Sequence, residues 1–294
     1  MKNQSNLLKR SFSGAVFVVV LMACTLAGSI PMALLFLVVA IIGLFEFYRL
    51  MRKMGVSPQY FLGFSISFIV YYYFFHHHFF FAERLFIEPV LFLIFLLISS
   101  VFIAELFRKK ENPIINISVT LFGVAYIVLP FALLGEIANF KYGFEPRIVL
   151  SLFFLIWTND TFAYLTGSVF GKRKLLERIS PGKTWEGFLG GGLFTIILAF
   201  FLNDIFPVNY HIHMNRVDWI IIGLIVFIFG TLGDLVESMI KRVAGVKDSG
   251  NLIAGHGGIM DRFDSLIFVV PLIYGYLYFI KANIPYFSII FNGK

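Results

Sequence analysis

The sequence predicts an all-α polytopic membrane protein, and both its composition and its apolar runs indicate this class. Hydrophobic residues make up 59% of the 294 residues, and charged residues only 14%. Soluble domains carry about 25% charged residues, so this chain has too few to cover a surface in water. The mean hydropathy is +0.86, and apolar runs of about 20 residues, enough for a helix to cross a bilayer, recur along the chain.

About nine of these runs are predicted to form transmembrane helices. Their approximate ranges are 12–28, 31–50, 58–76, 86–106, 115–137, 148–169, 185–203, 218–240 and 262–281. Five spans belong to an N-terminal transmembrane region, residues 1–137, and four to a C-terminal region, residues 138–294. The C-terminal region also holds two polar cytoplasmic loops, so we expect the functional site there.

The positions of the basic residues predict the orientation of the spans. If the N-terminus lies in the cytoplasm, only six of the 24 Lys and Arg residues fall in outer segments. These six are Arg84, Lys141, Arg147, Arg216, Lys281 and Lys294. Because cytoplasmic loops carry the excess of Lys and Arg, the pattern predicts an N-in, C-out topology. The formal net charge of +7 therefore reflects topology, and no nucleic-acid partner is expected.

Three conspicuous features have plain explanations. Cys24 is the only cysteine, so no disulfide or cysteine-based metal site is expected. The run that ends at Cys24 resembles a lipoprotein signal, but the apolar pattern resumes at Pro31, which favours a retained span. The consecutive His76–His78 would point in different directions on a helix, so an interfacial role is expected. The glycines of Gly187–Gly192 indicate close packing between helices.

Two acidic residues of the N-terminal region lie near the cytoplasmic ends of their spans. Glu46 is close in sequence to Arg49, and Glu105 is close to Arg108. We expect both glutamates to extend toward the interface or to pair with these arginines.

Three spans of the C-terminal region carry carboxylates near their cytoplasmic ends. They are Asp160 in the sixth span, Asp234 and Glu237 in the eighth, and Asp261 and Asp264 at the start of the ninth. A spacing of three residues puts each pair on one helix face. A rise of about 1.5 Å per residue puts the aspartates at depths where they can converge. Charged groups inside a bilayer are costly, so these acids are candidate functional residues.

Carboxylates gathered at that depth need a cation or a proton. A hard divalent cation such as Mg²⁺ takes oxygen ligands from one or two carboxylates and from substrate phosphates. The alternative is internal salt bridging, for example of Asp234 with Lys241 or of Asp264 with Arg262. The sequence alone leaves both explanations open for each single acid, but the group together favours a cation.

The first polar loop precedes the seventh span and carries a candidate phosphate site. Pro181 and Gly182 predict a tight turn, and the backbone amides of such a turn can bind an anion. Lys183 adds a positive charge, and Ser180 and Thr184 add hydroxyl groups. Either hydroxyl residue can also cap the helix that follows. The G-x-x-x-x-G-K-[ST] spacing of a P-loop is absent.

The second polar loop lies between the eighth and ninth spans and mixes both signs of charge with glycines. Lys241, Arg242 and Lys247 are basic, and beside carboxylates they suggest the binding of phosphates with a divalent cation. Asp248 lies next to them. His256, flanked by glycines, either donates to a phosphate or acts as an acid or base, or else is a loop histidine bonded to backbone.

The polar residues of this loop form one dense pattern, which reads Ser238-x-Ile240-Lys241-Arg242-x4-Lys247-Asp248-x-Gly250-x2-Ile253-x2-His256-Gly257-Gly258-Ile259-x-Asp261-Arg262-x-Asp264. It resembles the signature of CDP-diacylglycerol synthases, also called phosphatidate cytidylyltransferases. Two upstream stretches resemble further motifs of that family: Trp157-x2-Asp160-x2-Ala163-Tyr164-x2-Gly167 and Ser180-Pro181-x-Lys183-Thr184-x-Glu186-Gly187. One departure is Ala254, where the family usually has proline or glycine.

The resemblance implies the transfer of a cytidylyl group from CTP to phosphatidate, which gives CDP-diacylglycerol and pyrophosphate with Mg²⁺ as cofactor. It implies metal ligands in the order Asp234 and Asp261, then Asp264, then Asp160 or Glu237. The implied phosphate-binding residues are Ser180, Lys183, Thr184, Lys241, Arg242 and Lys247. The implied catalytic residues are Lys241, Asp248 and His256. The choice of cytosine rests on the resemblance alone.

The expected partners are the two substrates, CTP and phosphatidate, and membrane lipids, and a homodimer is compatible with the sequence. CTP is cytosolic and phosphatidate lies in the membrane leaflet, so an active site at the cytoplasmic interface is where both can meet. The expected location is a bacterial inner membrane, with the two active-site loops facing the cytoplasm.

Two other functions fit parts of the pattern. A CTP-dependent lipid kinase, or another lipid-headgroup transferase, would share the membrane-edge carboxylates and the basic loops, and substrate assays separate it. A secondary transporter would use Asp160 and Asp234 in an ion pathway. The inverted repeats and broken helices typical of transporters are not evident in the sequence, and the acids gather at one membrane face.

Overall fold

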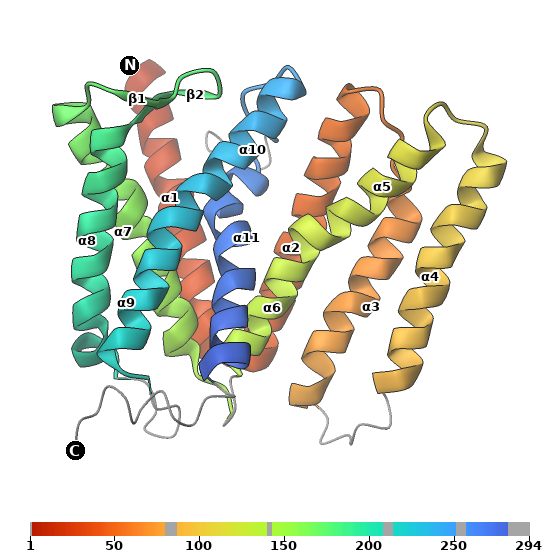
Figure 1. The fold of residues 1–294 in the computed structure, drawn as a ribbon, viewed down its shortest axis with the longest axis horizontal. Helices are drawn as coiled ribbons and strands as arrows, with labels where there is room; N and C mark the ends of the chain where they lie inside the picture. Colours follow the sequence, from red (N-terminus) through yellow and green to blue (C-terminus); the bar gives the residue numbers. More distant parts are fainter. Residues whose placement is uncertain (1, 80–86, 140–142, 208–213, 251–256, 282–294) are drawn as a thin grey trace.

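The structure is a computed structural model that describes residues 2–79, 87–139, 143–207, 214–250 and 257–281. Over these residues the chain forms a bundle of helices that run alternately up and down, with a small β-hairpin at one end (Figure 1). The helices are α1 Lys2–Ala27, α2 Ser29–Lys53, α3 Tyr60–Phe79, α4 Ile87–Arg108, α5 Pro113–Gly123, α6 Leu129–Ala138, α7 Pro146–Phe170, α8 Trp185–Ile205, α9 Arg216–Ile225, α10 Thr231–Val243 and α11 Met260–Gly275.

The predicted membrane class is confirmed by the length and apolar character of the helices. Among the described residues, six continuous helices are long and apolar enough to cross a membrane. They are Ser29–Lys53, Glu88–Arg108, Pro113–Ala138, Pro146–Phe170, Trp185–Ile205 and Arg216–Val243. Two shorter apolar helices, Ser13–Ala27 and Tyr60–Phe75, accompany them. The count of nine spans and the N-in, C-out orientation stay predictions.

Helix starts in the C-terminal region follow from local capping. Glu145 accepts a hydrogen bond from the Arg147 amide at 3.3 Å just ahead of α7. The Thr184 hydroxyl accepts from the Gly187 amide at 3.1 Å and so caps α8, as its sequence position predicts. Asn215 forms a reciprocal capping box with residue 218 at the start of α9. Each cap satisfies backbone amides that the first helical turn leaves unpaired.

Among the described residues three helices contain or end in a π-helical turn, and the third of these turns, Tyr276–Lys281, follows α11. Val124–Val128 joins α5 to α6, and Val226–Gly230 joins α9 to α10. Such turns insert an extra residue into a helix and are frequent at functional sites. The extra residue changes the direction in which the following side chains point. The second turn directly precedes Thr231 and Asp234, so it sets which face of α10 these two residues occupy.

The first polar loop folds as a β-hairpin, which the all-α prediction did not include. Strand β1, Lys174–Leu176, pairs antiparallel with strand β2, Ser180–Thr184. The predicted tight turn at Pro181 and Gly182 is wrong, because both residues lie within β2 and the turn falls at residues 177–179. Proline has no amide to donate, and a two-stranded hairpin has outer edges where none is needed.

Close packing between α7 and α8 is confirmed at the glycines of the seventh span. A Cβ atom at Gly187 would lie 2.6 Å from the Ala163 carbonyl oxygen, and one at Gly191 would lie 2.7 Å from that of Asn159. Both distances are far below van der Waals contact, so only glycine allows the two backbones to approach this closely. Asp160 directly follows Asn159, so this packing also fixes the position of that acid.

The N-terminal and C-terminal regions share one apolar core. The rings of Phe36 in α2, Phe131 in α6 and Phe263 in α11 are at most 3% exposed. Phe263 lies edge-on to Phe131 at 5.2 Å and to Phe36 at 6.4 Å between ring centroids. Because Phe263 sits between Asp261 and Asp264 in sequence, its packing in this core holds the start of α11 in place.

The hairpin lies at one end of the bundle together with the start of α1, the ends of α2 and α4 and the end of α10 (Figure 1). Helices α3 and α4 stand at the opposite edge from α7 and α8. The side chains of α4 are largely exposed, including Phe95 at 63% and Phe107 at 78%. These apolar surfaces suit contact with lipid.

Candidate functional site

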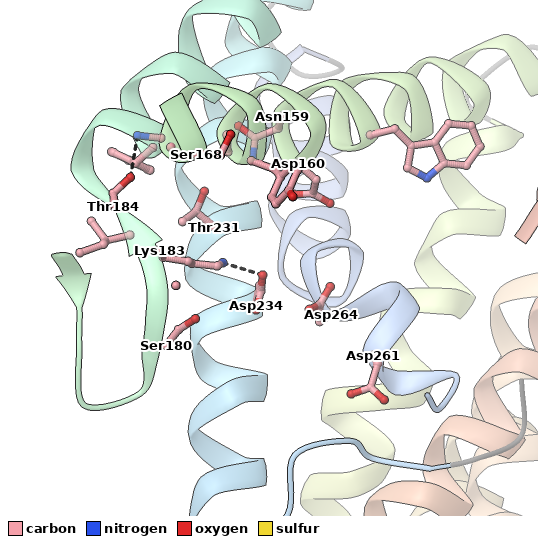
Figure 2. Close-up of a pocket in the computed structure, with 18 of the residues that line it drawn as sticks. Asn159, Asp160, Ser168, Ser180, Lys183, Thr184, Thr231, Asp234, Asp261 and Asp264 are labelled. Atoms are coloured by element: carbon pink, nitrogen blue, oxygen red, sulfur yellow. Dashed lines mark hydrogen bonds and ion pairs between the residues drawn. The ribbon is translucent and has the colours of Figure 1, made fainter. Parts of the chain in front are cut away.

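A cavity of about 680 Å³ lies between the hairpin and helices α1, α7, α8, α10 and α11. Most of its polar lining comes from segments far apart in sequence, as Figure 2 shows. The polar lining residues are Asn159, Asp160, Ser168, Ser180, Lys183, Thr184, Thr231, Asp234, Asp261, Arg262 and Asp264. The predicted convergence of the four aspartates on one site is therefore seen.

Three carboxylates face one another across this cavity. Asp160 extends from α7, Asp234 from α10 and Asp264 from α11 (Figure 2). Carboxylates gathered in one cavity repel one another when they are ionised. No group of three or more His, Cys, Asp or Glu side chains among the described residues is arranged tightly enough to enclose a metal ion. A cation held here would take its remaining oxygens from water or from a ligand.

One lysine from the hairpin reaches these acids. Lys183 Nζ lies 2.5 Å from Asp234 Oδ2, and both side chains are partly exposed, at 26% and 31%. The Ser238 hydroxyl donates to Asp234 Oδ1 at 3.3 Å from one helical turn further along α10. The internal salt bridge weighed for Asp234, with Lys241, is therefore not the one that forms. Lys183 places a positive charge at the cavity wall, where a phosphate can reach it.

Lys241 lies behind the cavity wall in a buried cluster of charges. Its ammonium group forms ion pairs with Glu237, one helical turn earlier, and with Asp261 Oδ1 at 2.7 Å. The Lys241 side chain is 12% exposed and Glu237 is fully buried. Neither residue lines the cavity. Their predicted roles, phosphate binding or catalysis for Lys241 and metal binding for Glu237, stay predictions.

Asp261 is held by four donors. Its carboxylate accepts from the Gly258 amide at 2.7 Å, from the Ser249 amide at 3.0 Å and from the Ser249 hydroxyl at 3.1 Å. Lys241 is the fourth donor, at 2.7 Å. Hydrogen bonds to an ionised carboxylate are stronger than neutral ones, so this set fixes the second polar loop to the start of α11. Asp261 also contributes to the cavity wall.

The remaining predicted residues divide between hairpin support and the second loop. Arg242 Nε donates to the Ile179 carbonyl at 3.4 Å, which ties α10 to the hairpin turn. Lys247 and Asp248 are exposed and do not line the cavity. His256 lies outside the described residues, as does Ala254. Ser180 and Thr184 both line the cavity, and the Thr184 hydroxyl also accepts the helix-cap hydrogen bond from Gly187.

Several lining residues carried no prediction. Asn159 is 3% exposed beside Asp160, and a polar amide inside an apolar span was a signal that could have found it. Thr231 precedes Asp234 by three residues and therefore shares its helix face. Gly14, Phe17 and Val18 of α1 close the cavity from the N-terminal region. Apolar residues in an apolar span give no such signal, so only the fold reveals them.

Comparison with known proteins adds an independent result. The profile of the cytidylyltransferase family matches residues 8–280. The chain is 34% identical over 268 residues to the phosphatidate cytidylyltransferase of Bacillus subtilis (strain 168), which covers 90% of this chain and 96% of that protein. It is 41% identical over 167 residues to the protein of the same name from Staphylococcus aureus (strain COL), covering 56% of this chain and 60% of that protein.

Proposed function

This chain belongs to the cytidylyltransferase family, and from that premise we propose that it is a phosphatidate cytidylyltransferase. It transfers a cytidylyl group from CTP to phosphatidate and releases pyrophosphate. A phosphate oxygen of the lipid attacks the α-phosphorus of CTP, and the bond from that phosphorus to the bridging oxygen of pyrophosphate breaks. Such a transfer needs positioning and charge neutralisation more than a protein nucleophile.

One observation carries the proposal: three carboxylates and the ammonium group of Lys183 face one another across the cavity. Lys183 neutralises phosphate charge from the hairpin side, and its pairing with Asp234 holds it in place before substrate arrives. The Ser180 hydroxyl lines the same wall and offers a donor to a phosphate oxygen. The cavity also reaches apolar residues of α1, so it joins a polar wall to a surface suited to a lipid.

The donor set of the cavity fits a hard divalent cation. The cavity is lined by four aspartates, Asp160, Asp234, Asp261 and Asp264, and by two basic side chains, Lys183 and Arg262, so acidic groups outnumber basic ones. Mg²⁺ prefers oxygen ligands and needs only one or two protein carboxylates when phosphates complete its shell. The resemblance implies Asp234 and Asp261 first, but Asp261 already has four donors, so we propose Asp234 and Asp264 as the first ligands, with Asp160 and Asp261 beside them. When bound, the cation neutralises charge that develops on the phosphates.

The proposed setting is the cytoplasmic face of a bacterial inner membrane. The hairpin and the ends of α2, α4 and α10 gather at the cavity end of the bundle. These segments carry most of the basic residues of the chain, and basic residues favour the cytoplasmic side. Cytosolic CTP would approach from that side, and phosphatidate from the adjacent leaflet.

The test is nucleotide incorporation by purified protein in liposomes that contain phosphatidate and Mg²⁺. CTP, ATP, GTP and UTP are offered in turn, and the lipid product and pyrophosphate are both quantified. We expect a liponucleotide from CTP with one pyrophosphate for each lipid. Phosphorylated lipid without pyrophosphate would indicate a lipid kinase instead, and no lipid product from folded protein would refute the proposal.

A further inference from the structure

Glu46 contradicts the expectation that it extends toward the interface or pairs with Arg49. It lies in α2, in the N-terminal region, and is only 2% exposed. Its Oε2 atom accepts hydrogen bonds from the Met260 amide at 3.0 Å and from the Ser249 hydroxyl at 3.1 Å. Both donors are more than 200 residues away in sequence. Glu46 therefore connects α2 to the two described ends of the second polar loop.

The bond to Met260 caps a helix from outside. Met260 is the first residue of α11, so its amide has no partner within that helix. A carboxylate at a helix start is also favoured by the helix dipole. Asp261 and Asp264 follow in the first turns of the same helix. Any movement of the start of α11 would therefore move both acids.

The bond to Ser249 reaches Asp261 by a second route. The Ser249 hydroxyl lies 3.1 Å from both Glu46 Oε2 and Asp261 Oδ2, and its single hydrogen is shared between these two carboxylates. Arg49, one helical turn after Glu46, donates to the Ser249 carbonyl at 3.1 Å. Helix α2 thus bonds both the side chain and the backbone of Ser249. Ser249 in turn donates to the carboxylate of Asp261, which lines the cavity.

Two glycines of the loop are fitted to the Glu46 carboxylate. A Cβ atom on Gly250 would collide with Glu46 Oε1, and one on Gly258 would collide with Glu46 Oε2 and the Ser249 hydroxyl. Because these two residues have no side chain, the loop backbone can approach a buried side chain of the same protein. Within the described residues, Glu46 Oε1 has no hydrogen-bond partner.

We propose that Glu46 is a positioning residue for the transfer reaction. It touches no part of the cavity and acts through Met260 and Ser249, which set the places of Asp261 and Asp264. The inference rests on the proposed function for its kinetic readout. This role would also involve the N-terminal region in the reaction, because Glu46 on α2 fixes the position of the second polar loop in the C-terminal region.

The test compares Glu46→Ala and Glu46→Gln with Glu105→Gln as a matched control. Glu105 is also buried near the same end of the bundle, at 5% exposure, but it bonds Gln59, Arg108 and Asn116 and lies away from the cavity. A misplacement of about 1 Å at a reacting centre can lower a rate by about a hundredfold. We expect that loss in kcat for Glu46→Ala, with KM for CTP changed by less than about threefold because Lys183 and the hairpin are untouched.

Glu46→Gln keeps one acceptor oxygen and removes the charge, so we expect an intermediate loss of kcat and a folded protein if Glu46→Ala proves too unstable. Glu105→Gln is expected to keep kcat within about threefold. An equal fall of kcat in Glu105→Gln would mean a general effect of losing a buried acid, and would overturn the proposal. So would unchanged kcat in both Glu46 variants.

Hydrogen exchange separates this inference from the proposed function, because it needs no activity. In folded Glu46→Gln we expect faster exchange at the Met260 amide and its neighbours in α11, and unchanged exchange in β2. Glu105→Gln should change neither segment. If wild-type protein makes no liponucleotide, the proposed function fails while exchange still decides the anchoring role. Unchanged exchange at the start of α11 in the Glu46 variant would overturn that role.

Discussion

The carboxylates near the cavity end of the bundle form two groups with different surroundings. The cavity acids, defined as Asp160, Asp234 and Asp264, face an open space, although Asp234 also pairs with Lys183 and Ser238, and Asp264 accepts from the amide of Ser265. The scaffold acids, defined as Glu46, Glu237 and Asp261, are bound to amides, a serine or Lys241. Leaving a charge in an apolar setting without partners is costly. The cavity acids are therefore the ones left for an external ligand, and the scaffold acids hold the cavity in shape.

Removal of divalent cations should separate the two groups most strongly. Chelation is expected to lower the transfer rate at least about a thousandfold, since the cavity acids then repel the phosphates. Added Mg²⁺ should restore the rate. The melting temperature in detergent should change little, because the scaffold acids are paired within the protein. Full activity in the presence of chelator, or unfolding on chelation, would break the comparison.

Asp234→Asn is the next largest expected effect. We expect a loss of about a thousandfold in kcat/KM, because the variant removes the charge that faces both Lys183 and the proposed cation. The protein should fold, since the Asp234 side chain is partly exposed. Asp204→Asn is the matched control, because Asp204 pairs with Arg216 at 3.0 Å away from the cavity. Steady-state kinetics of both variants measure kcat/KM. Near-wild-type activity in Asp234→Asn would refute the assignment of Asp234 to cation binding.

Lys183→Ala tests the basic side of the cavity. Loss of one charge-stabilising donor is expected to lower kcat/KM by about a hundredfold. Lys174→Ala serves as the control on the same hairpin, because Lys174 donates to the Pro181 carbonyl at 2.7 Å and does not line the cavity. The control should stay within about threefold of wild type. Equal losses in the two variants would indicate that only hairpin stability is being measured.

Gly191→Ala is expected to act mainly on stability, and through Asp160, which follows Asn159, it should also lower the rate, but by less than the variants above. The added methyl group would press on the Asn159 carbonyl and force α7 and α8 apart, at a cost of about 1–3 kcal/mol in unfolding free energy. Gly275→Ala is the control, since a Cβ atom there meets no heavy atom within 4 Å apart from its chain neighbours and the nearby backbone of its own helix. Thermal unfolding in detergent distinguishes them, and equal stability of the two variants would contradict the packing account.

The apolar helices and the acids that they carry could be predicted from the sequence, because both signals are local. A run of apolar residues needs no partner to be recognised, and Asp160, Asp234 and Asp264 stand out in such runs. The pairing of Glu105 with Arg108 was also predictable, since the two residues are one helical turn apart and bond at 2.7 Å. The resemblance to the family, carried by the second loop, is confirmed over nearly the whole chain.

The partners of the scaffold acids could not be predicted, because they come from distant parts of the chain. Glu46 bonds residues more than 200 positions away, whereas local spacing pointed to Arg49. Lys183 and Asp234 belong to separate elements, and local spacing pointed to Lys241 instead. The turn predicted at Pro181 failed for another reason: proline fits both a turn and an unpaired strand edge, and only the register of the hairpin decides between them.

The most direct test of the central claim follows the two ends of the CTP triphosphate in one assay. CTP labelled separately at its α- and γ-phosphorus is given to the wild type, to Asp234→Asn and to Asp204→Asn in phosphatidate liposomes with Mg²⁺. We predict that the α-label enters the lipid and the γ-label leaves in pyrophosphate, in wild type and Asp204→Asn alone. Entry of the γ-label into the lipid, or equal transfer by Asp234→Asn, would contradict the account.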